Sequence, residues 1–271
     1  MEIAEQFLAA KTGRPERCED GIVVTSEFAA VIDGGTDNTG HRYDGMSGGR
    51  FAMLACADAV RSLEPKADHL TALRCLTQTL AARLPPDMAL HDRPSAVLTV
   101  YSRARREIWQ VGDVGFWHVH LTEGGVNPRK LIDRYAADIR AAVIRVELAA
   151  GADQSALARD DPGRSAILGL LISQASFRNN LAAGELAYPA VDGCTVPAEL
   201  ITVHVVPPDV SGLVIASDGY PHILPTLSAS EQLLARLVSA DPLCIGELRG
   251  TKGTRPGNES FDDRAYLSLM L

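Results

Sequence analysis

Apolar residues recur with two different periods along the chain, and the changes between them predict an alternation of strands and helices. Short runs rich in Val, Ile and Phe, separated by turn residues, predict strands. They comprise two strands within 21–34 with a turn near Ser26, three within 95–121, and single strands at 201–206, 212–217 and 265–271. Because several of these strands follow one another closely, we expect antiparallel hairpins.

Between the strands, apolar positions fall three and four residues apart, which predicts amphipathic helices. These stripes lie at 49–63, 73–84, 129–151, 164–177 and 228–240. Pro85 ends the second helix, and Ser228 with Glu231 matches a capping box at the start of the last. Paired helices beside paired strands indicate a single domain, 1–271, in which sheets are sandwiched between helix layers.

Composition narrows the classes of function. The 271 residues are 46% apolar, enough for a sizeable core, and carry a net charge of −8 with a pI near 5.4. Such an acidic chain argues against nucleic acid as a partner, and no apolar run approaches the roughly 20 residues that span a bilayer. The N-terminus lacks a signal-peptide pattern, and the five scattered cysteines form no CxxC pair. We therefore expect a cytoplasmic protein without disulfides, a zinc knuckle or a membrane partner.

Acidic residues recur at the ends of the predicted strands. They are Glu19 and Asp20 before the first strand, Asp33 and Asp218 after apolar strands, Asp113 in an expected hairpin turn, and Asp262 and Asp263 before the last strand. Each alone is more simply an Asp-Gly or surface turn. A sandwich can bring them to one edge, where two charges about 4 Å apart repel by roughly 4 kcal/mol at an effective dielectric near 20. Oxygen donors without Cys or paired His favour magnesium or manganese over zinc.

The order of these motifs resembles that of the metal-dependent PP2C (PPM) phosphatases. It runs ED, a strand ending in DGG, Gly-Gly before a helix, GD, SDG after a strand and DD before the last strand. The likeness extends from Cys18 to the C-terminus and is interrupted by the helical region at about 127–197. It implies an α+β fold, a four-layer αββα sandwich whose two central antiparallel sheets are flanked by helices. It also implies hydrolysis of phosphoserine or phosphothreonine in proteins, through a binuclear Mn²⁺ or Mg²⁺ centre and a metal-activated water.

The resemblance further implies a role for each acidic position. Asp33 would bridge the two metal ions, joined by the carbonyl of Gly34, and Asp218 and Asp262 would be further ligands at the catalytic centre. The remaining acidic positions are Glu19 and Asp20, which would hold metal-bound waters, and Asp113, which would serve a third, weaker ion. The expected partners are a phosphorylated protein substrate and a cognate Ser/Thr kinase.

Several positions depart from the family pattern. The first motif reads Asp33-Gly34-Gly35-Thr36, without the His that follows in some members, and "YDGMSGG" offers Asp44 as a rival bridging residue. We prefer Asp33 because an apolar strand precedes it. The family's phosphate-binding Arg would fall at Pro15, with Arg14 and Arg17 each out of register. These gaps leave open a weak or inactive pseudophosphatase that binds a phosphorylated partner, or a small-molecule phosphatase. We expect the region 127–197 to border the active site and shape substrate access.

Overall fold

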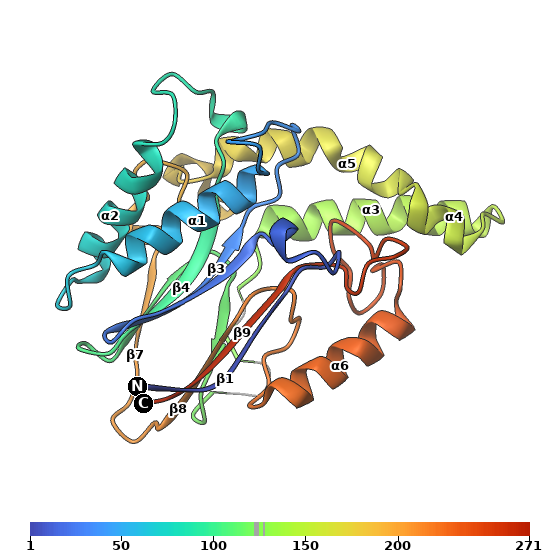
Figure 1. Ribbon diagram of the computed structural model, residues 1–271. Helices are drawn as coiled ribbons and strands as arrows, with labels where there is room; N and C mark the ends of the chain where they lie inside the picture. The colour runs from blue at the N-terminus through green and yellow to red at the C-terminus, as the bar shows by residue number, and fades with distance from the viewer. Residues whose placement is uncertain (122–124, 127) are drawn as a thin grey trace.

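Nine strands form two antiparallel sheets in the computed structural model, which describes residues 1–121, 125, 126 and 128–271 (Figure 1). The four-stranded sheet has the order β1 (Glu2–Ala9), β9 (Arg264–Met270), β8 (Gly212–Ala216), β6 (Gly115–Trp117). The five-stranded sheet has the order β2 (Asp20–Val24), β3 (Phe28–Gly34), β4 (Ala96–Ser102), β5 (Glu107–Val111), β7 (Thr202–Val205). Every pairing between these strands is antiparallel.

The two sheets pack face to face through one apolar layer. Val31 and Tyr101 of the five-stranded sheet meet Phe116, Ile215 and Leu267 of the four-stranded sheet in this core. All five side chains are almost completely buried. Burial of such side chains is the main favourable term in folding, so this layer fixes how the strand ends of one sheet face those of the other.

Helices cover the outer face of each sheet. The helices α1 (Gly48–Arg61) and α2 (His69–Ala81) pack on the five-stranded sheet, and α6 (Leu227–Ala240) packs on the other. The result is the predicted αββα sandwich with two central antiparallel sheets. Within the described residues, no helix is both long enough and apolar enough to cross a bilayer.

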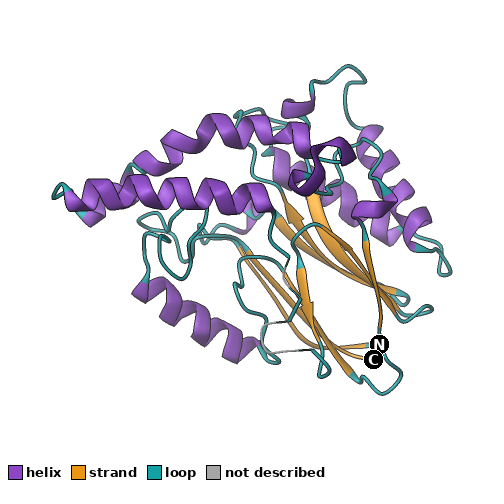
Figure 2. Ribbon diagram, turned by 180° about the vertical axis from the view of Figure 1, so that it is seen from behind, coloured by secondary structure: helices purple, strands orange, loops and turns teal. Residues whose placement is uncertain are grey.

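The remaining helices lie at one end of the sandwich, as both ribbon views show (Figures 1 and 2). They are α3 (Leu131–Ala149), α4 (Gln154–Arg159) and α5 (Pro162–Ser173). Short 3₁₀ helices occur at Pro15–Arg17, Leu90–Asp92, Gln174–Phe177, Leu181–Leu186 and Ala198–Leu200. Because α3 and α5 pack on each other through Ala136, Ile167 and Leu171, they form a layer of their own beside the sheet ends.

Besides the short 3₁₀ helices, one strand and one α-helix were not predicted from the sequence. The strand β1 pairs with β9 at the edge of its sheet, and Ile3 and Leu8 remain largely exposed. An edge strand packed on one side gives only a weak alternation of apolar and polar residues. The helix α4, capped by the Asp153 side chain, is six residues long. A helix this short does not show a helical period in the sequence.

The predicted hairpin at Asp113 is wrong. The strands β5 and β6 belong to different sheets, so residues 112–114 carry the chain from one sheet to the other. Gly112 permits the bend with a φ of +89°, and the carbonyl of Val114 accepts hydrogen bonds from Thr99 Oγ1 at 2.7 Å and Gln110 Nε2 at 2.8 Å. Periodicity finds two strands and a turn but does not reveal a change of sheet.

The predicted capping box of α6 is also wrong. Thr226 caps the helix by accepting a hydrogen bond from the Ala229 amide. Ser228 is already inside the helix, and Glu231 accepts a hydrogen bond from the hydroxyl of Tyr220 instead. The match to the box pattern was therefore accidental.

Candidate metal centre

The register of β2 and β3 places two carboxylates opposite each other. Asp20 pairs with Asp33 across the two antiparallel strands, and the Gly34 amide donates to the Glu19 carbonyl at 3.0 Å. Directly opposed side chains in antiparallel strands lie close together, and like charges there are destabilising. This end of the five-stranded sheet therefore concentrates negative charge.

The four-stranded sheet adds carboxylates from β8 and β9, which are neighbours in the sheet. Asp218 follows β8, and Asp262 and Asp263 precede β9. A Cβ at Gly219 would lie 2.0 Å from the Asp263 carbonyl oxygen, so only glycine allows the backbone after Asp218 to approach this closely. The SDG motif thus keeps the two strand ends in contact.

Ser217 links the carboxylate of Asp20 on the five-stranded sheet to the backbone of β9 on the four-stranded sheet. Its hydroxyl donates to Asp20 Oδ2 at 2.5 Å and accepts a hydrogen bond from the Ala265 amide at 2.8 Å. The side chain is 1% exposed. The SDG pattern alone does not predict this role for its serine.

The start of α1 packs against the DGG turn. A Cβ at Gly34 would lie 2.1 Å from the Gly49 carbonyl oxygen, which explains why glycine stands at both positions. Ser47, the N-cap residue, donates to Glu19 Oε1 at 2.6 Å. The start of this helix therefore contacts the acidic side chain of the ED motif, and negative charge is favourable at a helix N-terminus.

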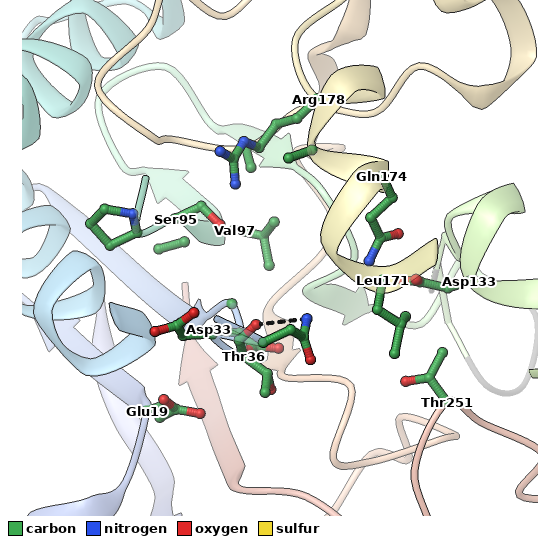
Figure 3. A pocket seen from close by; sticks show the side chains of 18 of the residues that line it. Glu19, Asp33, Thr36, Ser95, Val97, Asp133, Leu171, Gln174, Arg178 and Thr251 are labelled. Carbon is green, nitrogen blue, oxygen red and sulfur yellow. Dashed lines mark hydrogen bonds between the residues drawn. The ribbon is translucent and has the colours of Figure 1, made fainter. Parts of the chain in front are cut away.

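The acidic residues from all these segments form one group, which we call the carboxylate cluster. Its members are Glu19, Asp20, Asp33, Asp113, Asp218, Asp262 and Asp263. Asp20 and Asp263 are buried, at 3% and 2% exposed, and every member except Asp20 lines a common pocket together with Gly34. Figure 3 shows Glu19 and Asp33 on the same side of this pocket. The rival residue Asp44 is exposed and lies outside this lining.

Burial and mutual repulsion raise the pKa of several members. Burial raises the pKa of Asp33 and Asp20 well above the usual range, and neighbouring carboxylates raise it further. For Asp218, burial together with the charges of Asp262 and Asp113 raises the pKa to about 7. Carboxyl groups in this state need a proton or a cation nearby.

Asp262 behaves differently because two lysines contact it. Lys11 Nζ lies 3.0 Å from Oδ1, and Lys252 Nζ lies 2.5 Å from Oδ2. Burial alone would raise the pKa of Asp262, but the two ammonium groups outweigh it and lower the pKa to about 2. A third lysine, Lys130, has its Nζ 3.4 Å from Asp113 Oδ2. Sequence reasoning missed all three lysines.

The donor chemistry of the cluster fits a hard divalent cation, but its arrangement fits only in part. Carboxylate and carbonyl oxygens are the ligands that Mg²⁺ and Mn²⁺ prefer. Yet among the described residues, no group of three or more His, Cys, Asp or Glu side chains is placed to hold a metal ion. Asp263 uses both oxygens on the amides of Lys11 and Glu19, each at 2.8 Å, and Asp262 is paired with lysines. The candidate metal ligands that remain free of these contacts are Asp33, Asp218 and the Gly34 carbonyl.

The region 127–197 forms the opposite wall of the pocket, where we predicted it; its first residue, Asn127, lies outside the described residues. The wall includes Lys130, Asp133, Arg164, Leu171, Gln174, Arg178 and Tyr188, several of which face Asp33 across the pocket in Figure 3. Arg164 donates to Asn38 Oδ1 at 2.6 Å, next to the DGG turn. Arg14 and Arg17, by contrast, are exposed and outside the lining.

Comparison with solved structures places this architecture among known folds. A serine/threonine phosphatase of Mycobacterium tuberculosis, PstP/Ppp, matches with a TM-score of 0.50 and 17% identity, over 98% of this chain and 97% of that one. The phosphatase Stp1 of Staphylococcus aureus matches with a TM-score of 0.53 and 10% identity, over 100% and 96%. The catalytic domain of PstP in complex with two manganese ions matches at a TM-score of 0.45 and 16% identity, over 97% and 95%.

These likenesses define the class of fold. At 10–17% identity they speak for the fold alone, and they show that this chain has a PP2C-like fold, as its motif order predicted. No model of a protein family matches the sequence, and no curated protein matches it significantly. The site residues therefore have to be argued from this chain's own geometry.

Proposed function

We propose that the protein is a metal-dependent phosphatase that hydrolyses phosphoserine and phosphothreonine in proteins. One observation carries the proposal: carboxylates from the ends of β2, β3, β8 and β9 gather in one pocket, where burial and repulsion raise the pKa of Asp33 and Asp218. Such a group is costly to the fold, and binding of a divalent cation offsets that cost.

Each residue of the cluster has a task in this proposal. Asp33, the Gly34 carbonyl and Asp218 are the candidates for holding Mn²⁺ or Mg²⁺, and Asp262 would join them only where the ion displaces Lys11 and Lys252. Bound metal would supply an activated water and neutralise phosphate oxygens. Glu19, fixed by Ser47, and the buried Asp20, fixed by Ser217, would orient waters and the metal-binding side chains, and Asp113 would serve a further, weaker ion.

The substrate side of the pocket carries three arginines. Arg93, Arg164 and Arg178 line it, and Arg178 comes from the wall that faces Asp33. Guanidinium groups suit phosphate because they present planar, paired donors. We propose that they take over the role of the arginine that Pro15 replaces, and that the pocket accepts a phosphorylated side chain from a protein, with a cognate Ser/Thr kinase as the source of the substrate.

The test is hydrolysis of p-nitrophenyl phosphate and of a panel of phosphopeptides, measured with manganese and with EDTA, beside a small phosphorylated metabolite. Removing a residue that only supports a metal ligand lowers metal affinity or activity by about 10–100-fold. Asp33 is proposed to be a ligand itself, so Asp33→Asn should lower the rate by more than about 100-fold. The exposed Asp44→Asn serves as the matched control and should keep full activity. Turnover that persists in EDTA, or in Asp33→Asn, would contradict the proposal.

One observation favours a second candidate, a pseudophosphatase that binds a phosphorylated partner without turnover. Lysines already pair with Asp262 and Asp113, two of the proposed ligands. Phosphopeptide binding by titration calorimetry, in the absence of any hydrolysis at millimolar manganese, would select this alternative over the phosphatase.

A further inference from the structure

The distribution of lysine in this chain is uneven. Four of its 26 basic side chains are lysines: Lys11, Lys66, Lys130 and Lys252. Three of the four contact the carboxylate cluster, whereas arginine serves at almost all other basic positions. An ammonium group is a compact point charge with donors in several directions, whereas guanidinium is flat and extended. Lysine is thus the side chain that most closely resembles a small cation.

Two of these lysines together occupy the carboxylate of Asp262. Lys11 takes one oxygen and Lys252 the other, at 3.0 and 2.5 Å, so both oxygens are paired with ammonium groups. Lys11 Nζ also lies 3.7 Å from Asp263 Oδ2 and 3.9 Å from Glu19 Oε2. One ammonium group therefore lies within 4 Å of three carboxylates and attracts all of them.

The position of Lys11 is fixed by its own backbone. Its amide donates to Asp263 Oδ1 at 2.8 Å, and its carbonyl accepts from the Glu259 amide at 2.8 Å. These bonds tie the residue to the segment that also carries Asp262. The ammonium group is therefore delivered to the cluster by the fold and is not a surface side chain that happens to reach it.

The third lysine neutralises another part of the cluster. Lys130, the residue before α3, places Nζ 3.4 Å from Asp113 Oδ2, 3.8 Å from Asp133 Oδ2 and 5.2 Å from the centre of the Tyr188 ring. All of its partners except Asp113 come from the region 127–197. That region thus contributes a positive charge as well as a wall.

We propose that these ammonium groups stand in for divalent cations, Lys11 and Lys252 at Asp262 and Lys130 at Asp113, so that the chain binds one divalent cation where two or more would otherwise bind. The single ion is held on the Asp33 and Asp218 side, where carboxylates have carboxylate neighbours. This inference rests on the proposed function, because it assumes that the cluster is a metal site.

The test counts bound manganese by equilibrium dialysis against up to 1 mM Mn²⁺. Wild type is compared with Lys11→Met/Lys252→Met, with Lys130→Met, and with Lys66→Met as the matched control, because Lys66 is exposed and is not part of the cluster's ion pairs. We expect one ion per wild-type chain and per Lys66→Met chain. The double variant should bind a second ion at least about tenfold more tightly than wild type does, and Lys130→Met should gain a weaker additional ion.

The outcomes separate this inference from the proposed function. Two ions on the wild type, or no gain in either lysine variant, overturn the inference and leave the metal-dependent phosphatase intact. No bound manganese on any variant overturns both. If the double variant folds only when manganese is present, as followed by thermal melts, the ion replaces the lost ammonium groups and the inference is supported. If it does not fold at all, the same count on Lys252→Met alone decides.

Discussion

Two sides of one acidic pocket differ in what neutralises them. On one side, Asp33 and Asp218 have mainly other carboxylates as neighbours, and burial with repulsion raises their pKa. On the other, Asp262 has a similar place beside a strand end, but Lys11 and Lys252 lower its pKa to about 2. The residue type and the position in the fold are alike, so the neighbouring charges alone decide whether such an aspartate strains or stabilises the metal-free protein.

The sharpest way to test this difference is to remove Asp262. The Asp262→Asn change leaves two partly buried ammonium groups without their counter-ion. Breaking a fully buried pair costs 3–5 kcal/mol, and since these lysines keep 22% and 27% of their side-chain surface exposed, we expect a loss of about 2–3 kcal/mol. Chemical denaturation in EDTA measures it. A change below about 0.5 kcal/mol would show that the lysines do not stabilise this side.

Acidification tests the other side. Because the pKa of Asp218 is raised to about 7 in the folded state, the folded protein binds more protons than the unfolded chain between about pH 4 and 7. The stability that this proton contributes is present below pH 4 and is lost as the pH rises through 7. In EDTA, the free energy of unfolding should therefore increase by on the order of 1–2 kcal/mol from pH 7.5 to pH 5.

A variant isolates the carboxylate contribution to this pH dependence. Burial lowers the pKa of His118 and His204, which acts in the opposite sense because the unfolded chain then binds more protons below pH 6.5. Asp262 does not interfere, since its stabilisation is lost only as the pH falls from about 4 through 2. Denaturation series on wild type and Asp218→Asn should differ in slope, and parallel curves would contradict the raised pKa.

The smallest expected effect is the stability of Asp33→Asn. Replacing a carboxylate among carboxylates removes repulsion, so the metal-free variant should be as stable as wild type or up to about 1 kcal/mol more stable. Thermal melts in EDTA and in manganese, run beside Asp44→Asn, measure this. A structural turn aspartate would respond in the opposite way, with a lower melting temperature in EDTA and an unchanged response to manganese.

The parts of the site that the sequence predicts are those encoded locally. A strand that ends in Asp33-Gly34 or in Asp218-Gly219 is visible as a short pattern, and the order of such patterns was enough to predict the fold. The contacts that tune these residues are not local. Lys11 and Asp262 are 251 positions apart, and Ser217 and Asp20 are 197 positions apart. No pattern within a strand or helix carries that information.

The crossing at residues 112–114 was hidden for the same reason. The region 127–197 was predicted to border the site, but the side chains with which it faces the pocket were hidden as well. Whether β5 and β6 share a sheet depends on what packs against Val114, and the identity of the residues facing Asp33 depends on how α3 and α5 meet. The rarity of lysine was the one available signal for the missed residues. It becomes meaningful only once three of the four are seen together.

The hydrogen bonds of the Ser217 hydroxyl allow the opening of the pocket to be followed by hydrogen exchange at a single backbone amide. The Ala265 amide donates to this hydroxyl, and the hydroxyl is oriented by the hydrogen bond that it donates to Asp20 on the opposite sheet, so we expect separation of the sheets to release the hydroxyl and expose the amide to exchange. Its exchange with deuterium therefore reports sheet separation directly. We expect it to be among the slowest in the chain and to accelerate in Ser217→Ala, so that a single resonance follows the opening of the whole site.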